Sequence, residues 1–328
     1  MRRREFIGLL GGAAAAWPLP ARAQREQKRR VAVLMGGLAS ADVAGKAEVD
    51  AFEQGLQEMG WKPGGNIELD YRWPGAELDA VRSAASEIVA AHPDLVVSRT
   101  TPATTAIMGA GLPTIFVLVA DPIRSGYVQN LGHPGGNVTG FSNFEASVGG
   151  KWLELLKEAA PAILHAGMLF NPQTAPFAEG FLHSAQTAAQ SLGAVVAGAP
   201  CTSPADIENA FAETARQPGG GIIAIIDTFL TEHRDLLVDL ATRYRLPAVY
   251  GVRAIAQNGG LIAYAADYPD IFHRAATYVD RILHGTRPGD LPVQEPAKFT
   301  LSVNLKAATA IGLTLPQSLI IRADEVIE

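Results

Sequence analysis

The polar residues that could recognise a small molecule lie directly after the apolar runs that we expect to form parallel strands. In an open α/β sheet, ligands bind at the carboxyl ends of the strands, where the first N–H groups of the next helix are free. Hydroxyls, amides, two carboxylates, aromatic rings and small residues occupy these positions, and such a set suits a small zwitterion. The predicted ligand-binding residues are Gly36, Thr100, Thr101, Ala103, Asp121, Phe144, Asn171, Thr174, Asp227 and Tyr250.

Each end of a zwitterion has a predicted partner within this set. Thr100, Thr101 and Ala103 lie at a helix start, where free N–H groups and the helix dipole favour a carboxylate. Asp227 follows the most apolar strand of its half and would accept hydrogen bonds from an α-ammonium. The alternative is that Asp227 only caps a helix beginning near Thr231, because Asp, Asn, Ser and Thr favour that position. The expected apolar walls are Phe144 and Tyr250.

Motifs for catalysis, cofactors and metals are absent from the sequence. It has no Gly-x-Gly-x-x-Gly turn after a strand, no Gly-x-x-x-x-Gly-Lys-Ser/Thr loop and no Gly-x-Ser-x-Gly elbow. Its seven histidines never fall within four residues of one another, so no local metal motif exists. The single cysteine, Cys201, excludes an intramolecular disulfide and a multi-cysteine zinc site and is expected to be inert. We expect a protein that is not an enzyme and needs no cofactor or metal.

Length and composition indicate two globular domains. The chain has 328 residues, 48% hydrophobic and 18% charged, which suits about two domains and argues against disorder. The formal net charge of -6 argues against a dedicated nucleic-acid binder.

The first 23 residues have the pattern of an export signal. A basic Arg2–Arg4 segment precedes the short apolar run Ile7–Trp17, and Ala21–Ala23 offers the small-x-small site for cleavage before Gln24. The apolar run is too short to span a bilayer. The arginine pair resembles a twin-arginine signal, with an ordinary secretory signal as the alternative. Residues 1–23 are thus a predicted signal peptide, and the mature protein is expected in the periplasm.

Strand and helix patterns alternate along the rest of the chain. The first half has expected strands at 31–35, 67–73, 95–98, 114–119 and 138–142, and the second at 166–170, 194–197, 222–226, 247–250 and 261–264. Helical spacing marks about 43–59, 77–91, 102–109, 147–159, 175–192, 204–216 and 231–243. This alternation predicts an α/β fold with two doubly wound, Rossmann-like parallel-sheet domains. After them come an amphipathic helix at 268–284, a strand at 299–303 and a short helix capped by Asn304, which we expect to cross between the domains.

With these elements placed, the sequence resembles the ABC-transporter substrate-binding protein family that includes tryptophan- and tyrosine-binding members. The resemblance covers essentially all of the chain after the signal peptide, in order. The matching segments are Val119–Pro122, Pro134–Phe141, Lys151–Lys157, Phe170–Pro172, Gly259–Tyr264, Asp290–Val293, Asn304–Lys306, Gly312–Pro316 and Ala323–Ile327.

The resemblance implies a type I periplasmic-binding-protein fold, in which two α/β domains joined by three crossovers close on a ligand. The crossovers would lie near 142–146, 264–267 and 291–297. Domain 1 would be residues 31–142 plus 266–292, and domain 2 residues 143–265 plus 293–328. The implied protein is a monomer that captures an amino-acid-like solute and hands it to an ABC permease with its ATPase subunits, without nucleic acid.

Arg99 departs from the small residues that the family usually has beside the cleft. A cation there suits an anionic or larger ligand. The alternative is that Arg99 is a solvated residue at the rim of the cleft and does not contact a ligand. Two other functions stay open at this point: an exported cofactor-containing enzyme, and a ligand-sensing partner of a membrane receptor.

Overall fold

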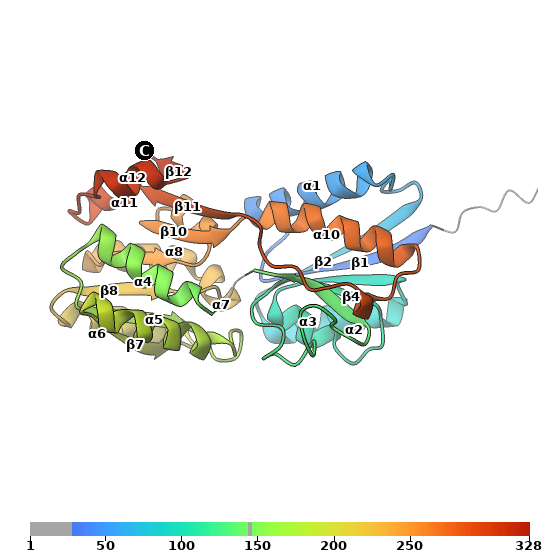
Figure 1. Ribbon diagram of the computed structural model, residues 1–328, viewed down its shortest axis with the longest axis horizontal. Coiled ribbons are helices and arrows are strands. Elements are labelled where there is room, and N and C mark those ends of the chain that lie inside the picture. Colours follow the sequence, from blue (N-terminus) through green and yellow to red (C-terminus); the bar gives the residue numbers. More distant parts are fainter. Residues whose placement is uncertain (1–27, 144–145) are drawn as a thin grey trace, which may run out of the picture.

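The computed structural model describes residues 28–143 and 146–328. Two α/β domains lie side by side along its long axis (Figure 1). The predicted signal peptide and Phe144 fall outside the described residues.

The first domain is built on a five-stranded sheet in which every strand is parallel to its neighbours. Its order is β2 (Ile67–Gly75), β1 (Arg29–Gly36), β3 (Leu95–Arg99), β4 (Thr114–Val119) and β5 (Val138–Ser142). The alternating segment 67–73 is therefore at the sheet edge, as its half-solvated pattern predicts. The helices between the strands are α1 (Val43–Glu58), α2 (Leu78–Ala91) and α3 (Thr101–Ile107).

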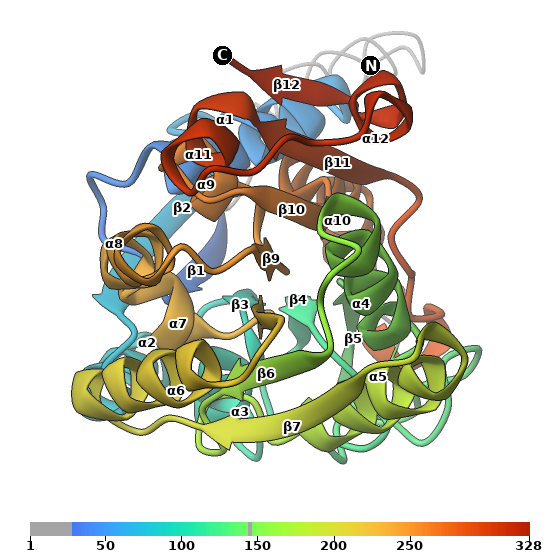
Figure 2. The ribbon, with the colours of Figure 1, turned by 90° about the vertical axis from the view of Figure 1, so that its left-hand side faces the viewer.

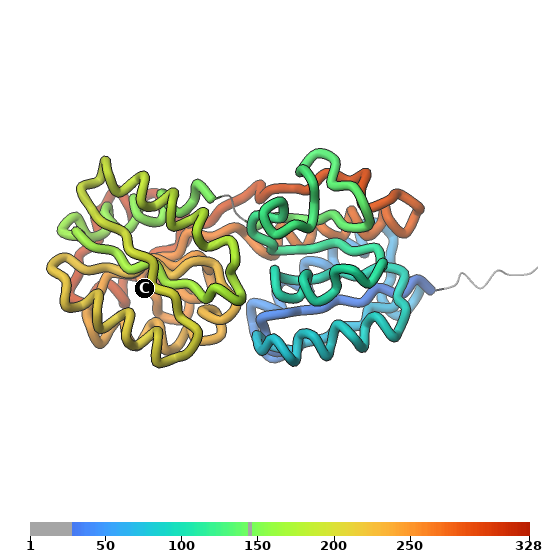
Figure 3. The backbone as a smooth tube through the Cα atoms, turned by 90° about the horizontal axis from the view of Figure 1, so that it is seen from below, coloured from blue at the N-terminus to red at the C-terminus, as the bar shows by residue number. Residues whose placement is uncertain are grey.

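The predicted amphipathic helix, α10 (Tyr268–Leu283), packs on the first sheet although it comes much later in the chain. It lies beside α1 on one face, whereas α2 and α3 cover the other (Figure 1). The rings of Phe52 in α1 and Phe272 in α10 meet edge to face, with centroids 6.3 Å apart. Gln294 then bridges Phe141 at the edge of β5, after the turn η1 (Pro288–Asp290). Figure 3 shows this late segment, in orange and red, returning to the domain formed by the blue and cyan chain.

The second domain has a seven-stranded sheet, and this sheet is mixed rather than parallel. Its order is β12 (Glu325–Ile327), β11 (Phe299–Asn304), β10 (Ile262–Ala266), β9 (Ala248–Tyr250), β8 (Gly220–Ala224), β6 (His165–Phe170) and β7 (Val195–Pro200). The strands up to β10 are parallel as expected, but β11 pairs antiparallel with β10. The chain enters β11 from the first domain and therefore from the opposite end of the sheet.

Helices cover both faces of the second sheet, with α4 and α5 on one side and α6 and α8 on the other (Figure 2). They are α4 (Val148–Ala159), α5 (Ala178–Leu192), α6 (Pro204–Arg216), α7 (Thr228–Glu232), α8 (Arg234–Tyr244), α9 (Arg253–Gln257), α11 (Leu305–Ala310) and α12 (Gln317–Arg322). The single helix expected at 231–243 is in fact α7 and α8, separated at His233. Asn304 caps α11 as predicted, because its side chain accepts a hydrogen bond from the Ala307 N–H.

Candidate functional site

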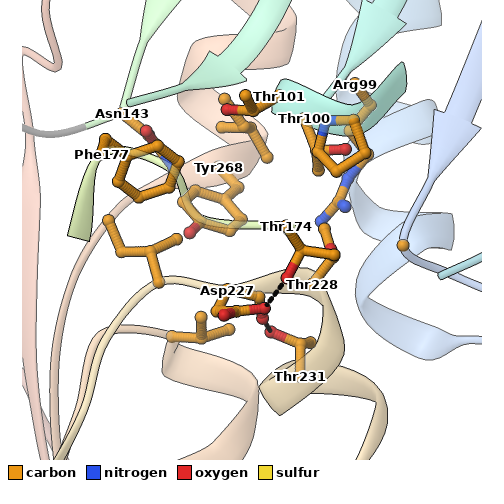
Figure 4. Close-up of a pocket in the computed structure, with 15 residues that line it drawn as sticks. Arg99, Thr100, Thr101, Asn143, Thr174, Phe177, Asp227, Thr228, Thr231 and Tyr268 are labelled. Atoms are coloured by element: carbon orange, nitrogen blue, oxygen red, sulfur yellow. Dashed lines mark hydrogen bonds between the residues drawn. The ribbon is translucent and has the colours of Figure 1, made fainter. Parts of the chain in front are cut away.

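A cavity lies between the two domains, at the carboxyl ends of their strands, and the space there that atoms do not fill, open solvent included, is about 450 Å³. Residues from both domains and from the chain crossings line it, as Figure 4 shows. They include Arg99, Thr100, Asn143, Phe177, Asp227 and Tyr268.

Arg99, at the end of β3, is held in place by a buried ion pair. Its Nε and Nη2 donate to the two carboxylate oxygens of Glu48 in α1, at 2.7 and 3.1 Å, and its Nη1 donates to the Gly36 carbonyl at 2.8 Å. The two side chains are only 6% and 1% exposed. Burial by itself would lower the pKa of Arg99, but the Glu48 carboxylate raises this pKa above its usual value. The interpretation of Arg99 as a solvated rim residue is therefore wrong.

Asp227 receives hydrogen bonds from two segments of the second domain, the turn at 171–174 and the start of α7. Its Oδ1 accepts from the Thr174 hydroxyl at 2.6 Å and from the Phe229 N–H at 2.8 Å, and its Oδ2 accepts from the Asn171 N–H at 2.5 Å. Burial raises the pKa of the Asp227 carboxyl, while these hydrogen bonds act in the opposite direction. Asp227 does cap a helix, which starts at Thr228 rather than near Thr231. Asp227 also lines the cavity.

Several polar atoms in the cavity wall lack a hydrogen-bond partner within the described part of the chain. They are the hydroxyl oxygens of Thr100, Thr228 and Tyr268 and the side-chain amide oxygen of Asn143. Thr100 is the N-cap residue of α3 but makes no side-chain cap, so capping does not account for its hydroxyl. The Tyr268 hydroxyl lies beside Asn143, and burial raises its pKa to about 12. Buried polar groups normally have partners, so these atoms indicate a bound solute or water.

The ten predicted site residues are only partly brought together. Thr100, Thr101, Thr174 and Asp227 line the cavity. Gly36 adjoins the lining residue Gly37 and packs against α3: a Cβ on Gly36 would lie 2.9 Å from that of Ala103, whose own side chain is fully buried.

Three of the remaining predicted residues do not line this cavity. Asn171 lies behind Asp227 and supports it through its backbone N–H. Asp121 accepts a hydrogen bond from the Arg124 N–H at 3.0 Å, and it thereby stabilises the turn that follows β4. Tyr250 is completely buried in the second domain's core. Phe144 is outside the described residues.

Eleven of the fifteen lining residues were absent from the predicted set, and they include Asn143, Phe177 and Tyr268. Asn143 lies within the predicted crossover at 142–146, and Tyr268 directly follows the one at 264–267, so their positions at the crossovers were the signal that could have identified them. Phe177 precedes α5 in a turn whose path has no signature in the sequence.

The domains touch at the rim of the cavity. Asp42, which caps α1, pairs with Arg234 in α8 at 3.2 Å, and Arg124 pairs with Glu179 in α5 at 2.6 Å. A Cβ on Gly37 would lie 2.8 Å from the Thr228 methyl group, so the two walls are also in close contact beside the cavity.

Metal-site and membrane-span features are not found in residues 28–143 and 146–328. In this part of the chain no group of three or more His, Cys, Asp or Glu side chains is arranged to hold a metal ion. None of the helices there combines the length and apolar character that crossing a bilayer requires.

Comparisons with known proteins match the chain to one family model and to several proteins of similar sequence or fold. A family model described as "ABC transporter substrate binding protein" matches residues 40–327. The tyrosine-binding protein of Clostridioides difficile (strain R20291) is 24% identical over 283 residues, which are 84% of this chain and 80% of that one. A conserved domain protein of Vibrio cholerae has a TM-score of 0.83 and 28% identity, covering 91% of this chain and 99% of that one. A domain from Streptococcus pneumonia in complex with L-Trp has a TM-score of 0.81 and 24% identity, covering 92% and 100%.

Proposed function

Because the chain belongs to the family of ABC transporter substrate-binding proteins, we propose that it captures an amino-acid-like solute in the cavity between its domains. The observation that carries this proposal is the set of buried polar atoms without partners in the cavity wall. An unsatisfied buried polar group costs about 1–3 kcal/mol, and a solute that satisfies several of them at once recovers this free energy.

The groups at two ends of the cavity suit the two charges of an amino acid. The N–H groups of Thr101 and Ala103 have no partner within the described residues, and together with the Thr100 hydroxyl they offer donors to a carboxylate. On the opposite wall, Oδ2 of Asp227 accepts a single hydrogen bond, so it keeps a lone pair for an ammonium group. The names of the tyrosine-binding relative and of the L-Trp complex support this ligand class.

The proposal includes hinge closure between domain 1, residues 31–142 plus 266–292, and domain 2, residues 143–265 plus 293–328. The Asp42–Arg234 and Arg124–Glu179 pairs join opposite domains, so separating the domains would break both. The protein would act as a monomer in the periplasm after twin-arginine export and cleavage before Gln24, and would deliver the solute to a permease and its ATPase subunits.

A thermal-shift panel of the L-amino acids and small carboxylates tests this function. A ligand at about 100 times its Kd stabilises the folded protein by roughly 2.7 kcal/mol, which raises the melting temperature measurably. We expect at least one amino acid to do so, and the same compound to reduce the radius of gyration in X-ray scattering. A panel in which no compound shifts the melting temperature would contradict the proposal.

A further inference from the structure

Arg99 keeps two N–H groups for a ligand. A guanidinium has five N–H donors, and three of those in Arg99 are used, two by Glu48 and one by the Gly36 carbonyl. The other two, one on each terminal nitrogen, have no partner in the part of the chain that the structure describes. Arg99 lines the cavity, and Figure 4 places its guanidinium on the side opposite Phe177 and Asn143. Because Glu48 and Gly36 fix its orientation, the free N–H groups are held in position before a ligand arrives.

The charge of Arg99 is already balanced. Glu48 neutralises it through two hydrogen bonds within a buried pair. The charged group on the facing domain is the Asp227 carboxyl, and among the described residues that line the cavity Arg99 is the one cation. A second carboxylate on the ligand would therefore add negative charge to a buried site that has no further cation to pair with it. An uncharged hydrogen-bond acceptor meets no such penalty.

A second group beside Arg99 completes the recognition site. Thr228, from the other domain, has a buried hydroxyl without a partner within the described residues. Thr228 and Arg99 both lie against Gly37, since a Cβ there would be 2.8 Å from the Thr228 methyl and 3.4 Å from the Arg99 Nη1. A carboxamide matches this pair, because its oxygen accepts from a guanidinium and its NH₂ group donates to a hydroxyl oxygen.

We propose that Arg99, with Thr228, is a specificity-determining residue that receives a carboxamide at the side-chain end of the ligand. The solute class is then an uncharged polar amino acid with a terminal amide, rather than an acidic or a purely apolar amino acid. This inference rests on the proposed function, because it assumes an amino-acid-like ligand in the same cavity. It adds how the site discriminates among ligand side chains. An apolar side chain would leave Arg99 and Thr228 without partners, and an acidic side chain would add an unpaired negative charge.

Calorimetric titration of the wild-type protein with L-glutamine, L-asparagine, L-glutamate and L-leucine is the first test. At least one of the two amides should bind about tenfold or more tightly than both glutamate and leucine, since a hydrogen bond to a charged group favours its proper partner by about that factor. If glutamate or leucine binds as tightly as the better amide, the inference is wrong. Binding of some amino acids without a preference for amides overturns only this inference, whereas binding of no amino acid overturns the proposed function with it.

Glu48→Gln tests the role of the Glu48 charge, because a purely structural role of Glu48 would not change the ratio of the affinities for glutamate and glutamine. This variant keeps a hydrogen-bond acceptor for Arg99 but removes the neutralising charge, so the affinity for L-glutamate should rise about tenfold relative to that for L-glutamine. The double variant Arg99→Met/Glu48→Leu removes both buried charges together and should lose the preference for amides. The matched control is Arg322→Met/Glu158→Leu, which removes an exposed Arg–Glu pair in the second domain. An unchanged glutamate-to-glutamine ratio in folded Glu48→Gln overturns the inference. If that variant does not fold, the wild-type titration decides.

Discussion

Replacing Asp227 by asparagine separates its structural contribution from its contribution to binding. In the wild-type protein both carboxylate oxygens accept hydrogen bonds, Oδ1 from Thr174 and Phe229 and Oδ2 from Asn171. An asparagine has one accepting oxygen. If that oxygen takes the place of Oδ1, the new NH₂ group points at the Asn171 N–H, and two donors face each other.

The expected cost follows from this geometry. Asparagine is as good an N-cap as aspartate, so the start of α7 is retained. The hydrogen bond from the Asn171 N–H to a charged acceptor is lost, and a buried donor stays unsatisfied. Such a loss costs about 1.5–3 kcal/mol, so the free energy of unfolding of the ligand-free Asp227→Asn protein should fall by about 2 kcal/mol.

Urea unfolding of ligand-free protein, followed by tryptophan fluorescence, measures this change. The control is Asp50→Asn, which alters an exposed carboxylate paired with Lys46 and should change stability by less than about 0.5 kcal/mol. An Asp227→Asn protein as stable as the control would refute the argument from the Asn171 contact. If Asp227 pairs with the ammonium group of a ligand, the Asp227→Asn protein should also bind that ligand less tightly than the wild-type protein, by about 2–5 kcal/mol.

Three further predictions concern other parts of the molecule. Hydrogen bonding to Arg253 lowers the pKa of Glu325 to about 2, so the stabilisation of the fold by the ionised Glu325 is complete above about pH 5 and is lost as the pH falls towards 2. The free energy of unfolding of Glu325→Gln, measured across this range, should therefore depend less on pH than that of the wild-type protein. Burial raises the pKa of the Cys201 thiol to about 12, so the folded protein should not react with a thiol reagent at pH 8, and rapid labelling there would contradict the placement of Cys201. The exposed Arg124–Glu179 pair joins the two domains, so Arg124→Glu should weaken solute binding about threefold and Arg124→Glu/Glu179→Arg should restore it, whereas equal affinities throughout would exclude a contribution to closure.

The parallel core of both domains could be predicted from the sequence because buried strands are continuous apolar runs bounded by glycine or polar residues. Segments such as 114–119 and 138–142 have this pattern and are strands with those bounds. The short elements α9, α12 and β12 could not be predicted, since three to six residues carry no measurable period. The antiparallel direction of β11 depends on where the chain returns from the first domain, which no local pattern states.

The site was predictable where it follows the strand-end rule, as with Thr100 and Asp227, and not where it depends on long-range pairing. Glu48, in helix α1, contacts Arg99 at the end of strand β3, 51 residues away in sequence. Nothing in the surroundings of either residue predicts that the two pair and are buried. The prediction of Tyr250 as a wall of the cavity rested on its position at a strand end, but a large aromatic side chain at that place is also suited to the domain core, where it lies.

The late return of α10 to the first sheet has a consequence for the order of events during synthesis. When the ribosome has completed β5, every strand of the first sheet exists, but Phe272, Ala275 and Val279, which belong to its core, have not been made. At about 5–20 residues per second, the chain from Ser142 to Tyr268 takes roughly 6–25 s to synthesise. During this time one face of the nascent sheet lacks its second covering helix. The domain whose strands are made first is therefore completed only after most strands of the other domain have emerged.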